Sequence, residues 1–112
     1  MRTWGVGIFD NDLAVAIKAD FEKLVADGDS VFAAADKLIE KYSEANSSVM
    51  YLALASLQLD YDVIHPKIKK RALTAIISGN AAEAWEESGT AVFENRKAVL
   101  QELRQRLLAV PT

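Results

Sequence analysis

The stretch VMYLALASLQL, residues 49–59, is the longest apolar run in the chain and is interrupted only by Ser56 and Gln58. Its eleven residues are too few to cross a membrane, which takes about 20. The run therefore predicts a buried helix. A helix that is apolar on nearly all sides belongs at the centre of a bundle, because each of its faces needs an apolar neighbour. The rest of the chain is expected to pack around residues 49–59.

The segments before this run read as two amphipathic helices. Over residues 13–27, apolar side chains recur at steps of four, four and three, which is the spacing of one helical face, and Gly28 ends the segment. A second helix is expected to open at Asp29 or Ser30 and to run to about Ala45. The side chains expected to face the core are Leu13, Ile17, Phe21 and Leu24 in the first helix and Phe32, Ala35, Leu38, Ile39 and Tyr42 in the second.

The segments after residue 59 are predicted to form three further helices. Pro66 suits the first position of a helix, where its missing N–H costs nothing, and Gly79 ends that helix. A short helix is expected over residues 81–88 and a long one over residues 91–109. The expected buried stripes are Ile68, Ala72, Ala75 and Ile76, with Leu73 and Ile77 beside them, and Val92, Val99, Leu103, Leu107 and Val110, with Leu100 and Leu108 beside them.

These elements predict an all-α fold, a single compact domain over residues 1–112. Residues 10–112 form a bundle of five to six helices, and residues 1–9 form an extended aromatic segment that packs on it. No stretch alternates apolar and polar residues for long enough to indicate a central strand. Helix caps, helix stops and apolar periodicity agree along the chain, and that agreement favours the all-α interpretation.

Composition excludes several classes of protein. The chain has 112 residues, 51% of them hydrophobic, a formal charge of −3 and no cysteine. Without cysteine there is no disulfide framework and no thiolate metal site. The mild acidity argues against a dedicated nucleic-acid binder, which usually carries a basic face. The first residues hold no apolar core of a signal peptide, which predicts a cytoplasmic protein outside the membrane.

The string TWGVGIF at residues 3–9, followed by Asp12, resembles the opening of a family of small bacterial proteins, the domain of unknown function 4259. Its members typically begin Met-Gly-Thr-Trp-Gly-x-Gly-x-Phe-x-Asn-Asp. Core segments such as residues 51–55 and Val99-Leu100 are also similar, although Arg2 stands where the family has Gly and Tyr51 where Trp is expected. The resemblance implies a small helical bacterial domain and carries no reaction.

Asp10 and Asp12 flank Asn11 in a cluster with two interpretations. Two nearby carboxylates could bind Mg²⁺ or act as acid and base. Alternatively, all three residues are candidates for the N-cap of the first helix, where acidic side chains are also favoured by the helix dipole. Capping is the favoured interpretation, and no metal or other cofactor is expected.

Trp4 and Phe9 could line an aromatic ligand pocket, but they are expected instead to cover an open end of the bundle. The intervening Gly5-Val6-Gly7 is not a dinucleotide-binding fingerprint, because no strand precedes it and Asp10 stands where a glycine is needed.

His65, the only histidine, could act as a general base. It precedes Pro66 at a position typical of a helix N-cap, so a capping role is favoured. No catalytic residue is predicted.

Two further groups of side chains could form recognition surfaces. Lys67, Lys69, Lys70 and Arg71, joined by Arg96 and other basic residues further on, are expected to form a solvated helix face rather than a phosphate-binding one. The other candidates are the aromatic and acidic residues Tyr51, Tyr61, Trp85, Glu86 and Glu87. An ordinary position at the edge of the core is the favoured interpretation for them.

The sequence as a whole favours a non-enzymatic protein that binds and masks a protein partner, as an immunity protein or inhibitor does. The partner could also be a second copy, because helices with wide apolar faces favour a homodimer. The alternative is a small-molecule-binding or hydrolytic site built from Asp10, Asp12 and His65. Nucleic-acid binding through residues 67–71 is considered unlikely.

Overall fold

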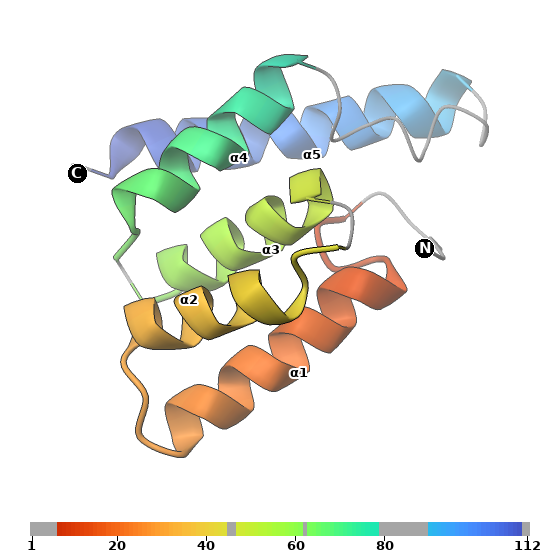
Figure 1. Ribbon diagram of the computed structural model, residues 1–112. Helices are drawn as coiled ribbons and strands as arrows, with labels where there is room; N and C mark the ends of the chain where they lie inside the picture. Colours follow the sequence, from red (N-terminus) through yellow and green to blue (C-terminus); the bar gives the residue numbers. More distant parts are fainter. Residues whose placement is uncertain (1–6, 45–46, 62, 79–89, 111–112) are drawn as a thin grey trace.

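The apolar run forms helix α3 (Ser47–Leu59), which lies in the middle of the bundle (Figure 1). From Val49 to Leu59, every residue except Tyr51 is buried. The helix contacts α1 (Asp12–Ala26), α2 (Val31–Lys41), α4 (Pro66–Ser78) and α5 (Thr90–Ala109). The central position predicted for residues 49–59 is therefore confirmed, and the protein is an all-α bundle.

Our computed structural model describes residues 7–44, 47–61, 63–78 and 90–110. Residues 81–88, where a short helix is expected, lie outside the described residues, as do Trp4, Trp85 and Glu86. Among the helices described, none combines the length and apolar character that a membrane crossing requires.

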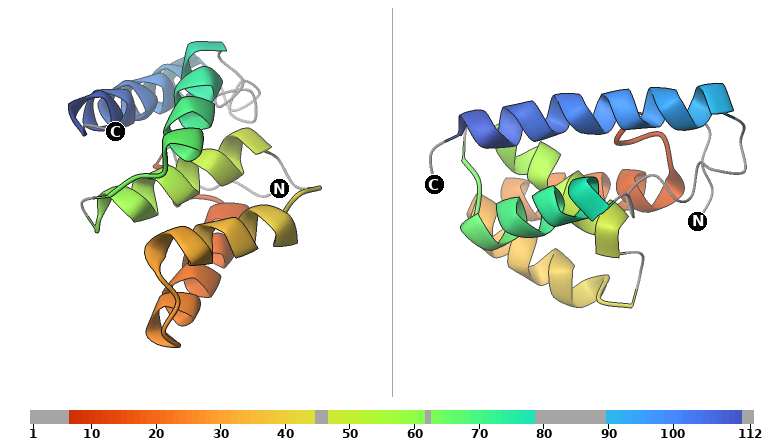
Figure 2. Two further views of the ribbon diagram at one scale, coloured as in Figure 1. Left: turned by 60° about the vertical axis from the view of Figure 1, so that its left-hand side comes forward. Right: turned by 90° about the horizontal axis from the view of Figure 1, so that it is seen from above.

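Helices α1 and α2 form an antiparallel pair on one side of α3 (Figures 1 and 2). Gly28 follows α1 with a φ of 109°, and the N–H of Asp29 donates to the carbonyl of Leu24, which is the pattern of a glycine-terminated helix. Ser30 then caps α2 by accepting a hydrogen bond from the N–H of Ala33. The predicted stop and start between the two helices are both confirmed.

Helices α4 and α5 lie on the other side of α3, as Figure 1 and the left-hand view of Figure 2 show. The buried stripe of α4 is the predicted one: Ile68, Ala72, Ala75 and Ile76. In α5, Leu103 and Leu107 are buried as expected, and Leu100 is buried as well. Leu108 is 54% exposed and Ile77 is 72% exposed, so neither adds to the core as the sequence suggested.

Two expectations for α2 are wrong. Phe32 is 41% exposed, whereas Ala34, which was not assigned to the inner face, is fully buried beside Ala35. The helix also ends at Lys41 rather than at about Ala45. Tyr42 leaves the helical conformation, and its hydroxyl donates to Asp20 of α1 over 2.6 Å. The end of α2 thus coincides with a contact to α1. No glycine or proline in the sequence marks this end.

Candidate functional site

The carboxylates at the start of α1 are engaged with nearby backbone. Oδ2 of Asp10 accepts a hydrogen bond from the N–H of Gly7 over 3.0 Å, and Oδ1 of Asp12 accepts one from the N–H of Leu13 over 2.9 Å. Asn11 is the N-cap: it is fully buried, and its Oδ1 accepts from the N–H of Ala14. The capping interpretation of this cluster is confirmed for Asn11, while the two aspartates stabilise the turns on either side of it.

Gly7 has a steric role in this turn. A Cβ at position 7 would lie 2.8 Å from Oδ2 of Asp10, closer than such atoms approach. A side chain there would displace the carboxylate from the N–H that it accepts. The glycine therefore lets the chain fold tightly over the end of α1, where Ile8 and Phe9 pack against the core.

Arg96 of α5 joins this turn from a distant part of the chain. Its side chain is fully buried, and its Nη1 donates to the carbonyl of Gly7 over 3.1 Å. Burial lowers the pKa of Arg96 to about 10, and the negative charge of Asp10 opposes that shift. The guanidinium is thus charged at neutral pH inside the protein. The expectation that Arg96 belongs to a solvated basic face is wrong, because the N-terminal turn covers it.

His65 sits at the start of α4 and acts as its cap. Its Nδ1 accepts a hydrogen bond from the N–H of Lys67 over 3.1 Å, and its carbonyl accepts from the N–H of Lys69. The edge of its ring contacts Phe32 at the start of α2, with ring centroids 5.5 Å apart. The capping role favoured for His65 is confirmed.

The structure does not bring Asp10, Asp12 and His65 together. The two aspartates lie at the start of α1, and His65 lies beside the starts of α2 and α4, at the opposite end of the bundle (Figures 1 and 2). Within the part of the chain described, no group of three or more His, Asp or Glu side chains could hold a metal ion. The geometry gives no support to a catalytic centre made from these three residues.

The end of the bundle that carries His65 also presents exposed apolar side chains. We call Phe32, Tyr61, Val63 and His65 the aromatic patch. Phe32 is 41% exposed, Tyr61 46% and Val63 37%, and His65 is half-buried. Sequence reasoning selected Tyr61 and His65 but missed Phe32, whose helical position matched the core-facing spacing. Its neighbour Ser30, a helix cap, was the available signal that Phe32 lies in the first turn, close to the edge of the bundle.

Three residues of the aromatic patch are hydrogen-bonded to Gln58 of α3. This side chain is fully buried, and its Oε1 accepts from the N–H of His65 over 3.0 Å. Its backbone carbonyl accepts from the N–H groups of Tyr61 and Val63. The ring of Tyr61 also packs against the buried ring of Phe21, with centroids 6.0 Å apart. Tyr61, Val63 and His65 are therefore each tied to Gln58 by a backbone N–H.

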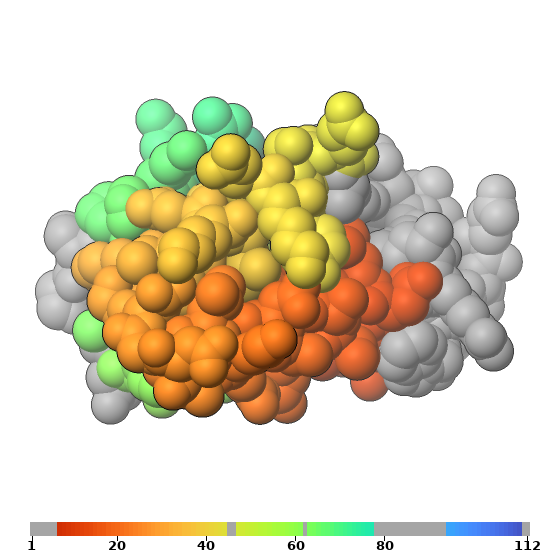
Figure 3. Space-filling view, turned by 60° about the horizontal axis from the view of Figure 1, so that its bottom comes forward, coloured from red at the N-terminus to blue at the C-terminus, as the bar shows by residue number. Residues whose placement is uncertain are grey.

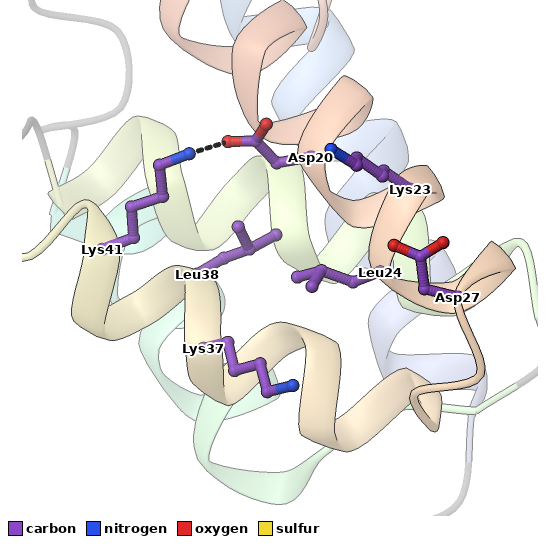
Figure 4. A pocket seen from close by; sticks show the side chains of 7 residues that line it. All are labelled: Asp20, Lys23, Leu24, Asp27, Lys37, Leu38 and Lys41. Carbon is purple, nitrogen blue, oxygen red and sulfur yellow. Dashed lines mark hydrogen bonds and ion pairs between the residues drawn. The ribbon is translucent and has the colours of Figure 1, made fainter.

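A groove of about 390 Å³ lies between α1 and α2, on the face of the molecule that Figure 3 shows. Leu24 and Leu38 meet at its centre, and charged side chains surround them (Figure 4). The charged side chains that line the groove are Asp20, Lys23, Asp27, Lys37 and Lys41.

The charges of this groove largely satisfy one another. Lys41 lies 2.7 Å from Oδ2 of Asp20, and Lys37 lies 2.7 Å from Oδ2 of Asp29. The hydrogen bonds from Lys41 and Tyr42 lower the pKa of Asp20, while burial and the same Asp20 contact raise the pKa of Tyr42 to about 12. These contacts join α1 to α2 and leave little unbalanced charge for a ligand, so we interpret the groove as structural.

Comparison of the chain with protein-family models, with curated proteins and with solved structures gives no match. The resemblance to the domain of unknown function 4259 therefore stays a prediction.

Proposed function

We propose that this protein is a non-enzymatic interaction protein that docks a protein partner on the aromatic patch. The observation that carries the proposal is the exposure of Phe32, Tyr61 and Val63 at one end of the bundle. Tyrosine and other aromatic side chains supply much of the binding energy at protein interfaces, because they bury a large area at a small entropic cost.

The rigidity of the patch supports this proposal. Tyr61 rests on Phe21, Phe32 contacts His65, and the loop that carries Tyr61, Val63 and His65 is tied to Gln58. A partner would therefore gain apolar contact without having to order a loop, and preorganisation of this kind strengthens binding.

Charged side chains accompany the patch as a polar rim accompanies an interface core. Asp60 and Arg106 form an exposed ion pair, with Oδ1 and Nη2 3.5 Å apart, and Lys67 is exposed next to the cap of α4. The function we propose is that of a masking protein, of the kind that immunity proteins and inhibitors represent. It is supported by the exposed apolar surface and by the local contacts of the alternative site residues, since His65 caps α4 and Asp10 and Asp12 bind nearby backbone N–H groups.

The proposal is tested by recovering the partner with matched surface variants. Tagged wild-type protein is expressed in the native cell and isolated with whatever binds it in stoichiometric amount. Phe32→Ser should lose that partner, since it removes a central apolar contact. Val15→Ser is the control, because Val15 is 43% exposed on α1 and lies outside the patch.

Equal recovery of the partner with Phe32→Ser and with the wild type would contradict the proposal, as would the lack of any stoichiometric partner. Sedimentation of the purified chain identifies the self-binding form of the proposal. A dimer that becomes monomeric in Phe32→Ser, but not in Val15→Ser, would make the partner a second copy.

A further inference from the structure

A second surface lies along α4, and its first residue, Pro66, follows His65 of the aromatic patch in the chain. We call it the α4 stripe, and it consists of Pro66, Lys69, Lys70, Leu73, Thr74 and Ile77. These positions are spaced by three and by one, so they share one side of the helix. They line an open groove of about 340 Å³.

The charge of α4 is one-sided. The helix contains Lys67, Lys69, Lys70 and Arg71 and no acidic residue, although the whole chain carries a charge of −3. All four basic residues lie in the first two turns, where the helix dipole favours negative rather than positive charge. The arrangement works against the stability of the isolated protein.

Among the residues that the structure describes, one of these basic side chains has a hydrogen bond to the end of another helix. The ammonium group of Lys69 donates to the carbonyl of Val110, at the end of α5, over 2.9 Å. Lys67, Lys70 and Arg71 are exposed, and none of them forms an ion pair with the residues that the structure describes. Their positive charge is available to a partner.

The other end of the α4 stripe is apolar. Ile77 is 72% exposed, more than any other large hydrophobic residue described, and Leu73 is half-buried one turn earlier. Exposing an isoleucine to water forgoes the roughly 1.5–3 kcal/mol that its full burial gives. The stripe therefore offers apolar contact and positive charge along one line of about three turns.

We propose that the α4 stripe binds an acidic amphipathic segment of a partner protein. Apolar side chains of that segment pack on Leu73 and Ile77, and its carboxylates pair with Lys70 and with Lys67 and Arg71 on the adjacent rows of the helix. Docking of an amphipathic segment along such a stripe is a common mode of peptide recognition. The inference goes beyond the proposed masking function, because the α4 stripe consists of other residues than the aromatic patch. Lys67, next to the stripe, is the one side chain that both proposals use.

The composition of the stripe favours this occupant over two others. A nucleic acid would meet the lysines, but its phosphates gain nothing from Leu73 and Ile77, and the stripe holds no aromatic side chain on which a base could stack. A second copy that presented its own α4 would offer the lysines no carboxylate, because α4 contains no acidic residue.

The test is a titration monitored by fluorescence anisotropy. The probe is a labelled helical peptide of about 18 residues, with leucines at positions i, i+3, i+4 and i+7 and glutamates on the flanking positions. A second peptide carries glutamine in place of each glutamate. A labelled DNA duplex and sedimentation of the protein alone complete the set.

We expect the glutamate peptide to bind, the glutamine peptide to bind about tenfold more weakly, and the affinity to fall as salt is raised. Lys70→Glu and Ile77→Ser should each weaken binding about tenfold, which corresponds to ~1.4 kcal/mol. Lys18→Glu is the charge-matched control, because Lys18 is exposed on α1. It should leave the affinity within about twofold of the wild type.

Circular dichroism and thermal unfolding establish that each variant is folded. The proposal is overturned if the glutamate peptide does not bind at millimolar concentration, or if both α4 variants bind it as the wild type does. It is equally overturned if the duplex binds more tightly than the peptide at the same salt concentration, or if the protein self-associates through Ile77.

Discussion

Helices α3 and α4 follow each other in the chain and have 13 residues each, yet they differ in how far their apolar side chains are buried. In α3 the apolar residues are buried on every side, and the helix contacts all four others described. In α4 one stripe is buried, while Ile77 is exposed near the end of the helix and Lys67 and Lys70 are exposed near its start. The fold buries the apolar residues of α3, whereas it leaves Ile77 of α4 in contact with water.

The largest difference in the free energy of unfolding is expected between two single variants that place an aspartate in α3 or in α4. Leu54→Asp buries a carboxylate at a position that is fully enclosed, which should cost more than about 5 kcal/mol and unfold much of the chain. Ile77→Asp should change the free energy of unfolding by no more than about 0.5 kcal/mol, because its side chain is already in water. Urea unfolding of both variants measures the difference, and comparable losses would refute the contrast drawn between α3 and α4.

A smaller loss is expected from Arg96, the charged residue that shares the core with α3. Arg96→Ala removes the donor to the carbonyl of Gly7 and leaves a cavity, so it should destabilise by about 2–4 kcal/mol. Lys97→Ala, next to it on the exposed side of α5, should cost only a few tenths of a kcal/mol, the value of an exposed pair with Glu94.

Thermal unfolding of the two alanine variants is the measurement. Matching melting temperatures would mean that Arg96 does not hold the N-terminal turn against α5. Arg96→Met provides a refinement: it fills the volume without the charge, and it should recover part of the loss, because a buried charge carries a desolvation cost.

The sequence predicts the helices well because their signals are local. The apolar run that predicts α3 lies within the helix itself. The glycine at position 28 ends α1 and the serine at position 30 caps α2 through contacts within about one turn. The same holds for the cap made by His65. Such features require no knowledge of what packs against the helix.

The sequence fails where distant segments decide the outcome. Arg96 is buried because a turn 89 positions earlier in the chain folds over it, and nothing in α5 itself marks it apart from the other basic residues. Phe32 has the spacing of a core residue, but it is 41% exposed in the first turn of α2, and Ala34 and Ala35 take the inner positions. For this reason the sequence indicates Tyr61 and His65 of the aromatic patch but not Phe32.

The smallest predicted effect is a pH dependence of the free energy of unfolding. It arises from the contact between α1 and α2, which does not involve α3 or α4. The pKa of Asp20 is lowered in the folded state by hydrogen bonds from Lys41 and Tyr42, so its stabilising contribution is complete above the ordinary aspartate pKa of about 4 and is lost as the pH falls below it. The pKa of Tyr42 is raised to about 12, so its contribution is complete below the ordinary tyrosine pKa of about 10 and is lost as the pH rises from there to about 12.

Urea unfolding of the wild type and of Asp20→Asn should therefore differ by a constant amount between about pH 4 and pH 10, and the difference should shrink on both sides. Because Lys41 and Asp20 are partly exposed, the plateau should not exceed about 1 kcal/mol. Tyr42→Phe separates the two limbs: removing the hydroxyl should make the alkaline limb smaller and keep the acid limb, since Lys41 still pairs with Asp20. An alkaline limb of unchanged size in Tyr42→Phe would contradict the contribution assigned to the hydroxyl of Tyr42.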